Sequence, residues 1–196
     1  MLCSTREKGL FIQEIPNEKG AIMITVKMLG TGGGGTTDLY NTCFVIKNEQ
    51  GLFLVDTGGG IEILKRLKKS GIELTDIHDI FISHSHIDHI MGLFWMFKMF
   101  KGNNKVNIYC NDVVFEAIKN ISGYILPDRL KNSITSVANF ILLQDGDKHT
   151  INGVEYRFFD ILAKGVKQYG FESVLDGNKF IFLGDETLNP ELNDKI

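Results

Sequence analysis

The chain has 196 residues, of which 43% are hydrophobic and 23% are charged, and its formal net charge is −3. This balance predicts one globular domain with a sizeable core, and the negative net charge argues against a dedicated nucleic-acid surface. The three cysteines fit neither a disulfide framework nor a C-x-x-C metal site, so a reducing, cytoplasmic location is expected. The sequence has no recognisable export signal and no apolar run of about 18 residues, so no membrane contact is expected.

Hydrophobic patterning then predicts a succession of short elements. Residues 1–20 are interpreted as an N-terminal extension and residues 21–196 as the domain. Strands come first in a hairpin and later in alternation with helices, which indicates a layered α/β architecture. Asp112 is placed to cap the third helix, and His149 is interpreted as a surface residue of a polar turn. The predicted strands span residues 22–29, 42–47, 52–55, 79–83, 106–110, 140–143, 154–161, 170–175 and 179–183, and the predicted helices span residues 61–69, 87–101 and 112–120.

Potential metal ligands are concentrated in one run between a predicted strand and a predicted helix. His84, His86, Asp88 and His89 all fall there, directly after an apolar stretch. Imidazole nitrogens and carboxylate oxygens are ligands for zinc, manganese and iron. A strand that ends at His84 would deliver all four groups to one rim of a sheet. The alternative, a solvated turn with chance histidines, is disfavoured by this density of ligands.

The spacing within the run indicates two directions. His84 and His86 lie two residues apart, so on extended backbone their side chains point the same way. Asp88 and His89 follow where the chain turns into the helix and can therefore point elsewhere. Such an arrangement suits two metal ions roughly 3.5–4 Å apart with a hydrolytic water between them.

The run HSHIDH at residues 84–89 resembles the signature of the metallo-β-lactamase-fold hydrolases. Three further segments resemble that family in the same order. LGTGG at residues 29–33 is similar to the end of the first strand in the ribonuclease Z-like branch, LVDTG at residues 54–58 to the D-x-G turn, and FLGD at residues 182–185 to the late G-D motif. The resemblance implies a four-layer αββα sandwich, with the metal site at one edge where both sheets meet.

The resemblance also implies roles for the site residues. His84 and His86 would hold one metal ion, Asp88 and His89 the other, and Asp185 would bridge the two. Asp88 would also orient the nucleophile. The implied cofactor is a pair of zinc ions, with manganese or iron as alternatives. The implied reaction is attack of a metal-bound hydroxide on a phosphodiester or another ester, with a small-molecule or nucleotide-like substrate.

Two further features have competing interpretations. Asp56 is expected to accept the second N–H of a histidine ligand and so fix its tautomer, the alternative being a plain turn residue. The glycine run at residues 32–35 lacks the lysine of a phosphate-binding loop, so we favour a tight turn with close backbone approach to the site.

The sequence departs from the family pattern at two places. A further histidine is expected within residues 160–168, where Leu162 or Lys164 stands instead, and the family pattern continues beyond the G-D motif to a final histidine that this sequence lacks. We therefore expect an incomplete second half, low metal occupancy and self-association. The alternative function is a catalytically impaired binding or scaffold protein that keeps the fold; transfer-RNA processing and β-lactamase activity are weaker interpretations.

Overall fold

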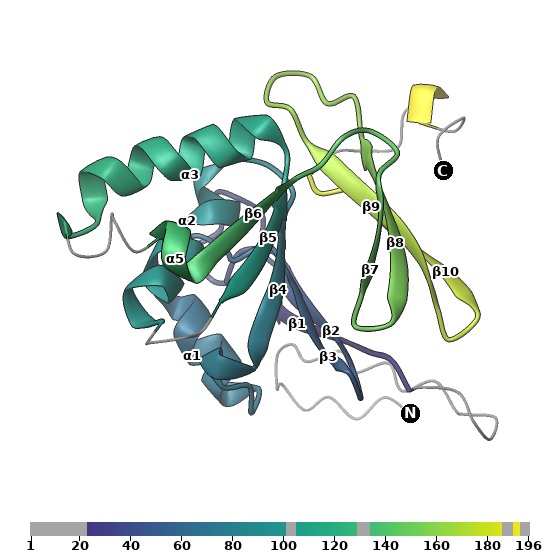
Figure 1. Ribbon diagram of the computed structural model, residues 1–196, viewed down its shortest axis with the longest axis horizontal. Coiled ribbons are helices and arrows are strands. Elements are labelled where there is room, and N and C mark those ends of the chain that lie inside the picture. Colours follow the sequence, from purple (N-terminus) through teal and green to yellow (C-terminus); the bar gives the residue numbers. More distant parts are fainter. Residues whose placement is uncertain (1–22, 101–104, 129–133, 186–189, 193–196) are drawn as a thin grey trace.

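The computed structural model describes residues 23–100, 105–128, 134–185 and 190–192, so the predicted N-terminal extension lies outside the described residues. Two β-sheets lie face to face, and the helices cover the outer face of the first sheet (Figure 1). Among the described helices, none is long and apolar enough to span a membrane.

The first sheet has six strands in the order of the sequence. Its first three strands are antiparallel, and from the third strand onward neighbouring strands are parallel. Parallel neighbours need a crossover connection, and here each crossover contains a helix. The strands are β1 (Thr25–Gly30), β2 (Cys43–Asn48), β3 (Gly51–Val55), β4 (Ile77–Ile82), β5 (Val106–Cys110) and β6 (Ala138–Leu142).

The helices bury apolar stripes against this sheet. In α1 (Glu62–Lys69) the buried residues are Ile63 and Leu67, four apart, which places them on one helix face. The other helices are α2 (Ile87–Met99), α3 (Asp112–Ile125) and the short α5 (Ile134–Val137). Their apolar side chains join β-strand residues in one core on the helical side of the sheet.

The second sheet has four antiparallel strands in the order β10-β9-β8-β7. Its strands are β7 (Lys148–Ile151), β8 (Val154–Asp160), β9 (Tyr169–Leu175) and β10 (Asn178–Phe182). The inner face is aromatic: Phe158 and Phe171 pack against Phe81 of the first sheet, with ring centroids 5.2 and 5.6 Å apart. This second core holds the two sheets together.

The predicted layered architecture is confirmed, with helices, first sheet and second sheet as three successive layers. Among the described residues, the outer face of the second sheet carries no α-helix. A single 3₁₀ turn at Pro190–Leu192 buries Leu192 against Phe159 and Ile161.

Two details of the sequence prediction are wrong. His149 lies in β7, where a polar turn was predicted, and its ring centroid is 5.5 Å from that of Tyr109, because pairing with β8 brings it over the aromatic core. Asn111, not Asp112, caps α3, since its side chain accepts a hydrogen bond from the backbone N–H of Val114 at 3.0 Å.

Candidate metal centre

The candidate ligands meet at the rim where β4 ends. His84 lies in the turn after β4, and His86 is the extended N-cap residue of α2, so α2 places Asp88 and His89 in its first turn. Asp185 comes from the other sheet, just beyond β10. A backbone hydrogen bond from Tyr169 to the carbonyl of Ser83, 3.0 Å long, joins the two sheets beside this rim.

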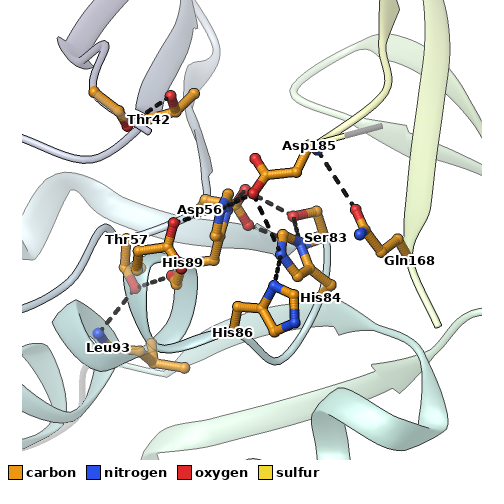
Figure 2. Close-up of polar contacts among 12 residues, drawn as sticks. Thr42, Asp56, Thr57, Ser83, His84, His86, His89, Leu93, Gln168 and Asp185 are labelled. Carbon is orange, nitrogen blue, oxygen red and sulfur yellow. Dashed lines mark hydrogen bonds and ion pairs between the residues drawn. The ribbon is translucent and has the colours of Figure 1, made fainter. Parts of the chain in front are cut away.

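The five predicted ligands form two groups that share Asp185. Figure 2 shows four of these ligands, His84, His86, His89 and Asp185, beside one another. In one group, His84 Nε2 lies 3.0 Å from His86 Nδ1 and 3.8 Å from Asp185 Oδ2. In the other group, His89 Nε2 lies 3.3 Å from Asp88 Oδ2 and 3.2 Å from Asp185 Oδ2. Within each group the ligand atoms all lie within 4.8 Å of one another. This is the pairing that the sequence predicted, although metal binding by these residues stays a prediction.

Asp56 is fully buried behind the histidines and accepts three hydrogen bonds. The Ser83 backbone N–H donates to Oδ1, while the Ser83 hydroxyl and the His89 Nδ1–H donate to Oδ2, each at 2.8 Å. Three donors satisfy a carboxylate that has no access to water. The bond to His89 fixes its ring orientation and leaves Nε2 to face the candidate ligands.

Ser83 extends this support to the second histidine. Its hydroxyl carries one hydrogen, which it donates to Asp56, so at the 3.0 Å contact with His84 Nδ1 it accepts. His84 then carries its proton on Nδ1 and presents an unprotonated Nε2 to the site. One buried carboxylate therefore orients His89 directly and His84 through Ser83.

The two histidines respond differently to this environment. Burial, reinforced by the nearby charge of His89, lowers the pKa of His84 to about 4, so its ring is neutral at pH 7. Burial also opposes charge on His89. The hydrogen bond and charge of Asp56, with the charges of Asp185 and Asp88, outweigh that effect and raise the pKa of His89 to about 9. In the metal-free chain, a proton on His89 thus lies among three carboxylates, a place where a cation is stabilised.

The donor set suits a divalent metal ion. Three imidazoles and two carboxylates converge, and the tautomer of His84 directs an unprotonated nitrogen into the group. Imidazole and carboxylate ligands of this kind bind zinc, manganese and iron. The residues present therefore fit the metal that the sequence implied.

Glycines let the backbone approach the ligands closely, as the sequence predicted. A Cβ added at Gly34 would lie 2.9 Å from Asp88 Oδ2, so only glycine leaves that carboxylate undisturbed. Thr57 was not predicted: its hydroxyl donates to the His89 carbonyl at 2.7 Å and accepts from the Leu93 N–H at 3.0 Å. These bonds tie the first two turns of α2 to the segment that follows β3.

The loop between β8 and β9 contributes no further histidine. Leu162 and Lys164, which stand at the expected position, are both exposed. Gln168 at the end of this loop does reach the site, and its side-chain oxygen lies 3.5 Å from the backbone nitrogen of Asp185. The sequence analysis assigned no role to Gln168 or Ser83, and it gave none to Thr57 although this residue lies in the LVDTG segment.

Comparisons with known proteins identify the fold. The family model for Anti-Pycsar protein Apyc1 matches residues 24–196. Ribonuclease Z of Pyrococcus abyssi is 37% identical over 111 residues, covering 54% of this chain and 36% of the relative. Anti-Pycsar protein Apyc1 of Paenibacillus harenae is 30% identical over 95 residues, covering 47% of this chain and 39% of the relative. The matches therefore span well under half the length of these relatives.

Solved structures agree on the architecture. The metallo-β-lactamase-fold protein YhfI from Bacillus subtilis matches with a TM-score of 0.68 at 17% identity, covering 86% of this chain and 65% of that one. The short form of human tRNase Z matches with a TM-score of 0.62 at 21% identity, covering 83% and 69%. The predicted metallo-β-lactamase fold and the resemblance to ribonuclease Z are thus confirmed.

Proposed function

The chain belongs to the Anti-Pycsar protein Apyc1 family, and on that premise we propose that it is a metal-dependent hydrolase of phosphodiesters or other esters. The observation that supports this proposal is the convergence of two three-residue ligand groups on Asp185, at the rim between the two sheets. Ligands of this kind bind zinc, and the relatives that carry the name ribonuclease Z favour a phosphodiester among the possible esters.

The roles of the residues follow from their positions. His84 and His86 would hold one metal ion, Asp88 and His89 a second, and Asp185 both. A bound metal would lower the pKa of a water toward about 7 and stabilise negative charge that develops on the ester. Asp88 has a carboxylate oxygen facing the site and would accept a hydrogen bond from the attacking water, which orients it.

Asp56 and Ser83 maintain the site without touching substrate. They hold a proton on Nδ1 of each histidine, so that with metal bound Nε2 of His89 and His84 would face the metal ions. Because both are buried, this tautomer choice does not depend on solvent. The small-molecule or nucleotide-like ester would approach from the side of the more exposed Asp185.

A second candidate function is a binding or scaffold protein that keeps the fold but turns over no substrate. The observation that favours it is the ligand count: each group has two residues of its own and shares the third. Fewer ligands lower metal affinity.

Metal content and turnover, measured on the same sample, decide between these functions. We expect one metal ion or fewer per chain after purification without added metal, and hydrolysis of bis(p-nitrophenyl) phosphate that depends on added zinc or manganese. Stoichiometric metal without turnover of any ester would support the binding protein. Two tightly held ions per chain would mean that the ligand count is wrong.

A further inference from the structure

Gln168 lies at the junction of the two halves of the site. The residue is only 6% exposed, and its backbone carbonyl accepts a hydrogen bond from the Ile161 N–H at 3.1 Å. The next residue, Tyr169, donates its N–H to the Ser83 carbonyl of the first half. The backbone around Gln168 is therefore fixed on both sides, so the side chain starts from a defined point.

The Gln168 side chain reaches under the turn that carries Asp185 (Figure 2). Its Oε1 accepts a long hydrogen bond, 3.5 Å, from the Asp185 N–H. The preceding Gly184 has φ +63°, and a Cβ there would lie 3.1 Å from the same oxygen. This contact requires both the left-handed turn and the small residue. Gln168 thus holds the residue that both ligand groups share.

The orientation of the amide follows from its partner. Asp185 N–H is a donor, so the amide oxygen faces it and the NH₂ group is directed elsewhere. Among the described residues, no acceptor bonds to Nε2 of Gln168. Gln168 Nε2 is not one of the fully buried side-chain atoms that lack a partner, so water can reach it, and the oxygen of a bound ligand can replace that water.

The charges around the site make a neutral donor useful. Asp56, Asp88 and Asp185 all lie within contact distance of His89, so the surroundings of an anionic ester are rich in carboxylates. The nearby Lys167 is engaged elsewhere, since its ammonium lies 2.7 Å from Asp112. An amide N–H can bind a phosphoryl oxygen without adding a charge that would repel the metal ions.

We propose that Gln168 is a residue of the site with two roles: Oε1 positions Asp185, and Nε2 donates a hydrogen bond to a non-reacting phosphoryl oxygen of the bound ester. The inference rests on the proposed function, because it places a phosphate group beside the metal ions. The two roles use different atoms of one amide, so substitutions can separate them.

Inorganic phosphate serves as the probe, titrated by calorimetry into the full chain loaded with zinc, and metal retention after dialysis is measured on the same samples. Gln168→Glu keeps an acceptor for Asp185 and loses the donor. Gln168→Met loses both without adding charge. Gln50→Glu, in the exposed turn between β2 and β3 at the opposite end of the sheet, controls for the added charge.

We expect Gln168→Glu to retain metal and to bind phosphate at least about tenfold more weakly than the unaltered chain. We expect Gln168→Met to weaken phosphate binding similarly and also to lose metal more readily. The Gln50→Glu control should match the unaltered chain in both measurements.

Each other result overturns a stated role. If phosphate binding weakens in Gln168→Glu but not in Gln168→Met, charge repulsion explains the loss, and Nε2 of Gln168 is not a hydrogen-bond donor to phosphate. Full metal retention in Gln168→Met would exclude the positioning of Asp185, and a loaded chain that binds no phosphate would exclude the phosphate site. Phosphate binding that depends on Gln168 without ester turnover would uphold this inference and reject the proposed hydrolase. Ester turnover that is unaffected in both Gln168 variants would uphold the proposed hydrolase and reject this inference.

Discussion

The two halves of the molecule hold their parts of the site in different ways. The first half supplies His84 and His89 as buried residues, each hydrogen-bonded to a buried partner, and Asp56 connects them. The second half supplies Asp185, whose side chain is 42% exposed and whose backbone has one long bond to Gln168.

Because of this difference, some ligand residues should contribute to folding stability as well as to metal binding, and others to metal binding alone. The buried ligands His84 and His89 belong to a hydrogen-bonded network, so a change to either disturbs folding as well as metal binding. Asp185 stands at the edge of that network, and a change there should affect the metal alone. The following predictions are arranged by the size of the expected effect.

Asp56→Ala should have the largest effect. It removes the acceptor of three buried hydrogen bonds and leaves donors of Ser83 and His89 without partners. We expect the free energy of unfolding of the metal-free chain to fall by about 3 kcal/mol or more, measured in urea. Asp185→Ala should change it by less than about 0.5 kcal/mol. Equal losses of unfolding free energy in Asp56→Ala and Asp185→Ala would contradict this difference between the two halves.

His86→Ala tests ligand supply without loss of fold. His86 is exposed, and its side chain makes no capping bond to α2, so the free energy of unfolding should change by less than about 0.5 kcal/mol. Metal affinity should nevertheless fall by more than about tenfold, because one of three ligands in its group is lost. The exposed His78→Ala is the matched control. A large loss of helical signal in metal-free His86→Ala would instead identify a structural histidine.

The same contrast explains what could be predicted from the sequence. The ligands of the first half lie in one short turn, so local spacing alone predicted that His84 and His86 act together and that Asp88 and His89 form a second group. Asp185 is distant in sequence and was placed only by family resemblance. Gln168 could not be predicted, because its position depends on the β8–β9 loop, where Leu162 and Gly165 both have positive φ. Such loop conformations follow from tertiary packing and leave no periodic signal.

Strand β7 was missed for a related reason. Its four residues are largely polar, and they form a strand because β8 pairs with them and His149 packs over Tyr109. β-strand preference depends on such neighbours more than on the residues themselves.

Glu172→Gln tests the ion pairs of Glu172 in the second sheet, where we expect a smaller change in the free energy of unfolding. Burial raises the pKa of Glu172, but a hydrogen bond from Arg157 at 2.6 Å and an ion pair with Lys179 at 3.0 Å outweigh this effect and hold the pKa below its usual range. A carboxylate with a lowered folded-state pKa stabilises the fold fully above its unfolded value of about 4.3 and loses that contribution as the pH falls through the folded value.

We therefore expect Glu172→Gln to lose about 1 kcal/mol of unfolding free energy at pH 7 and to converge with the unaltered chain in acid. Urea unfolding at a series of pH values measures this. Glu155→Gln, which breaks the more exposed pair with Lys148, should have a smaller effect. A difference that persists unchanged in acid would attribute the loss to packing.

Self-association, expected from the sequence, is the last and weakest effect. In the described part of the chain, β10 pairs only with β9, so its other edge has free backbone groups, and Ile181 is exposed beside them. Exposed edges of this kind pair with other chains. We expect light scattering to give a mass above 22.0 kDa that rises with concentration, and Ile181→Lys to lower it. Leu142→Lys, at another exposed apolar position on the edge strand β6 of the first sheet, is the matched control. If Leu142→Lys alone restores the monomer mass, the first half carries the associating edge. A monomer at every concentration would exclude association through the edge of either sheet.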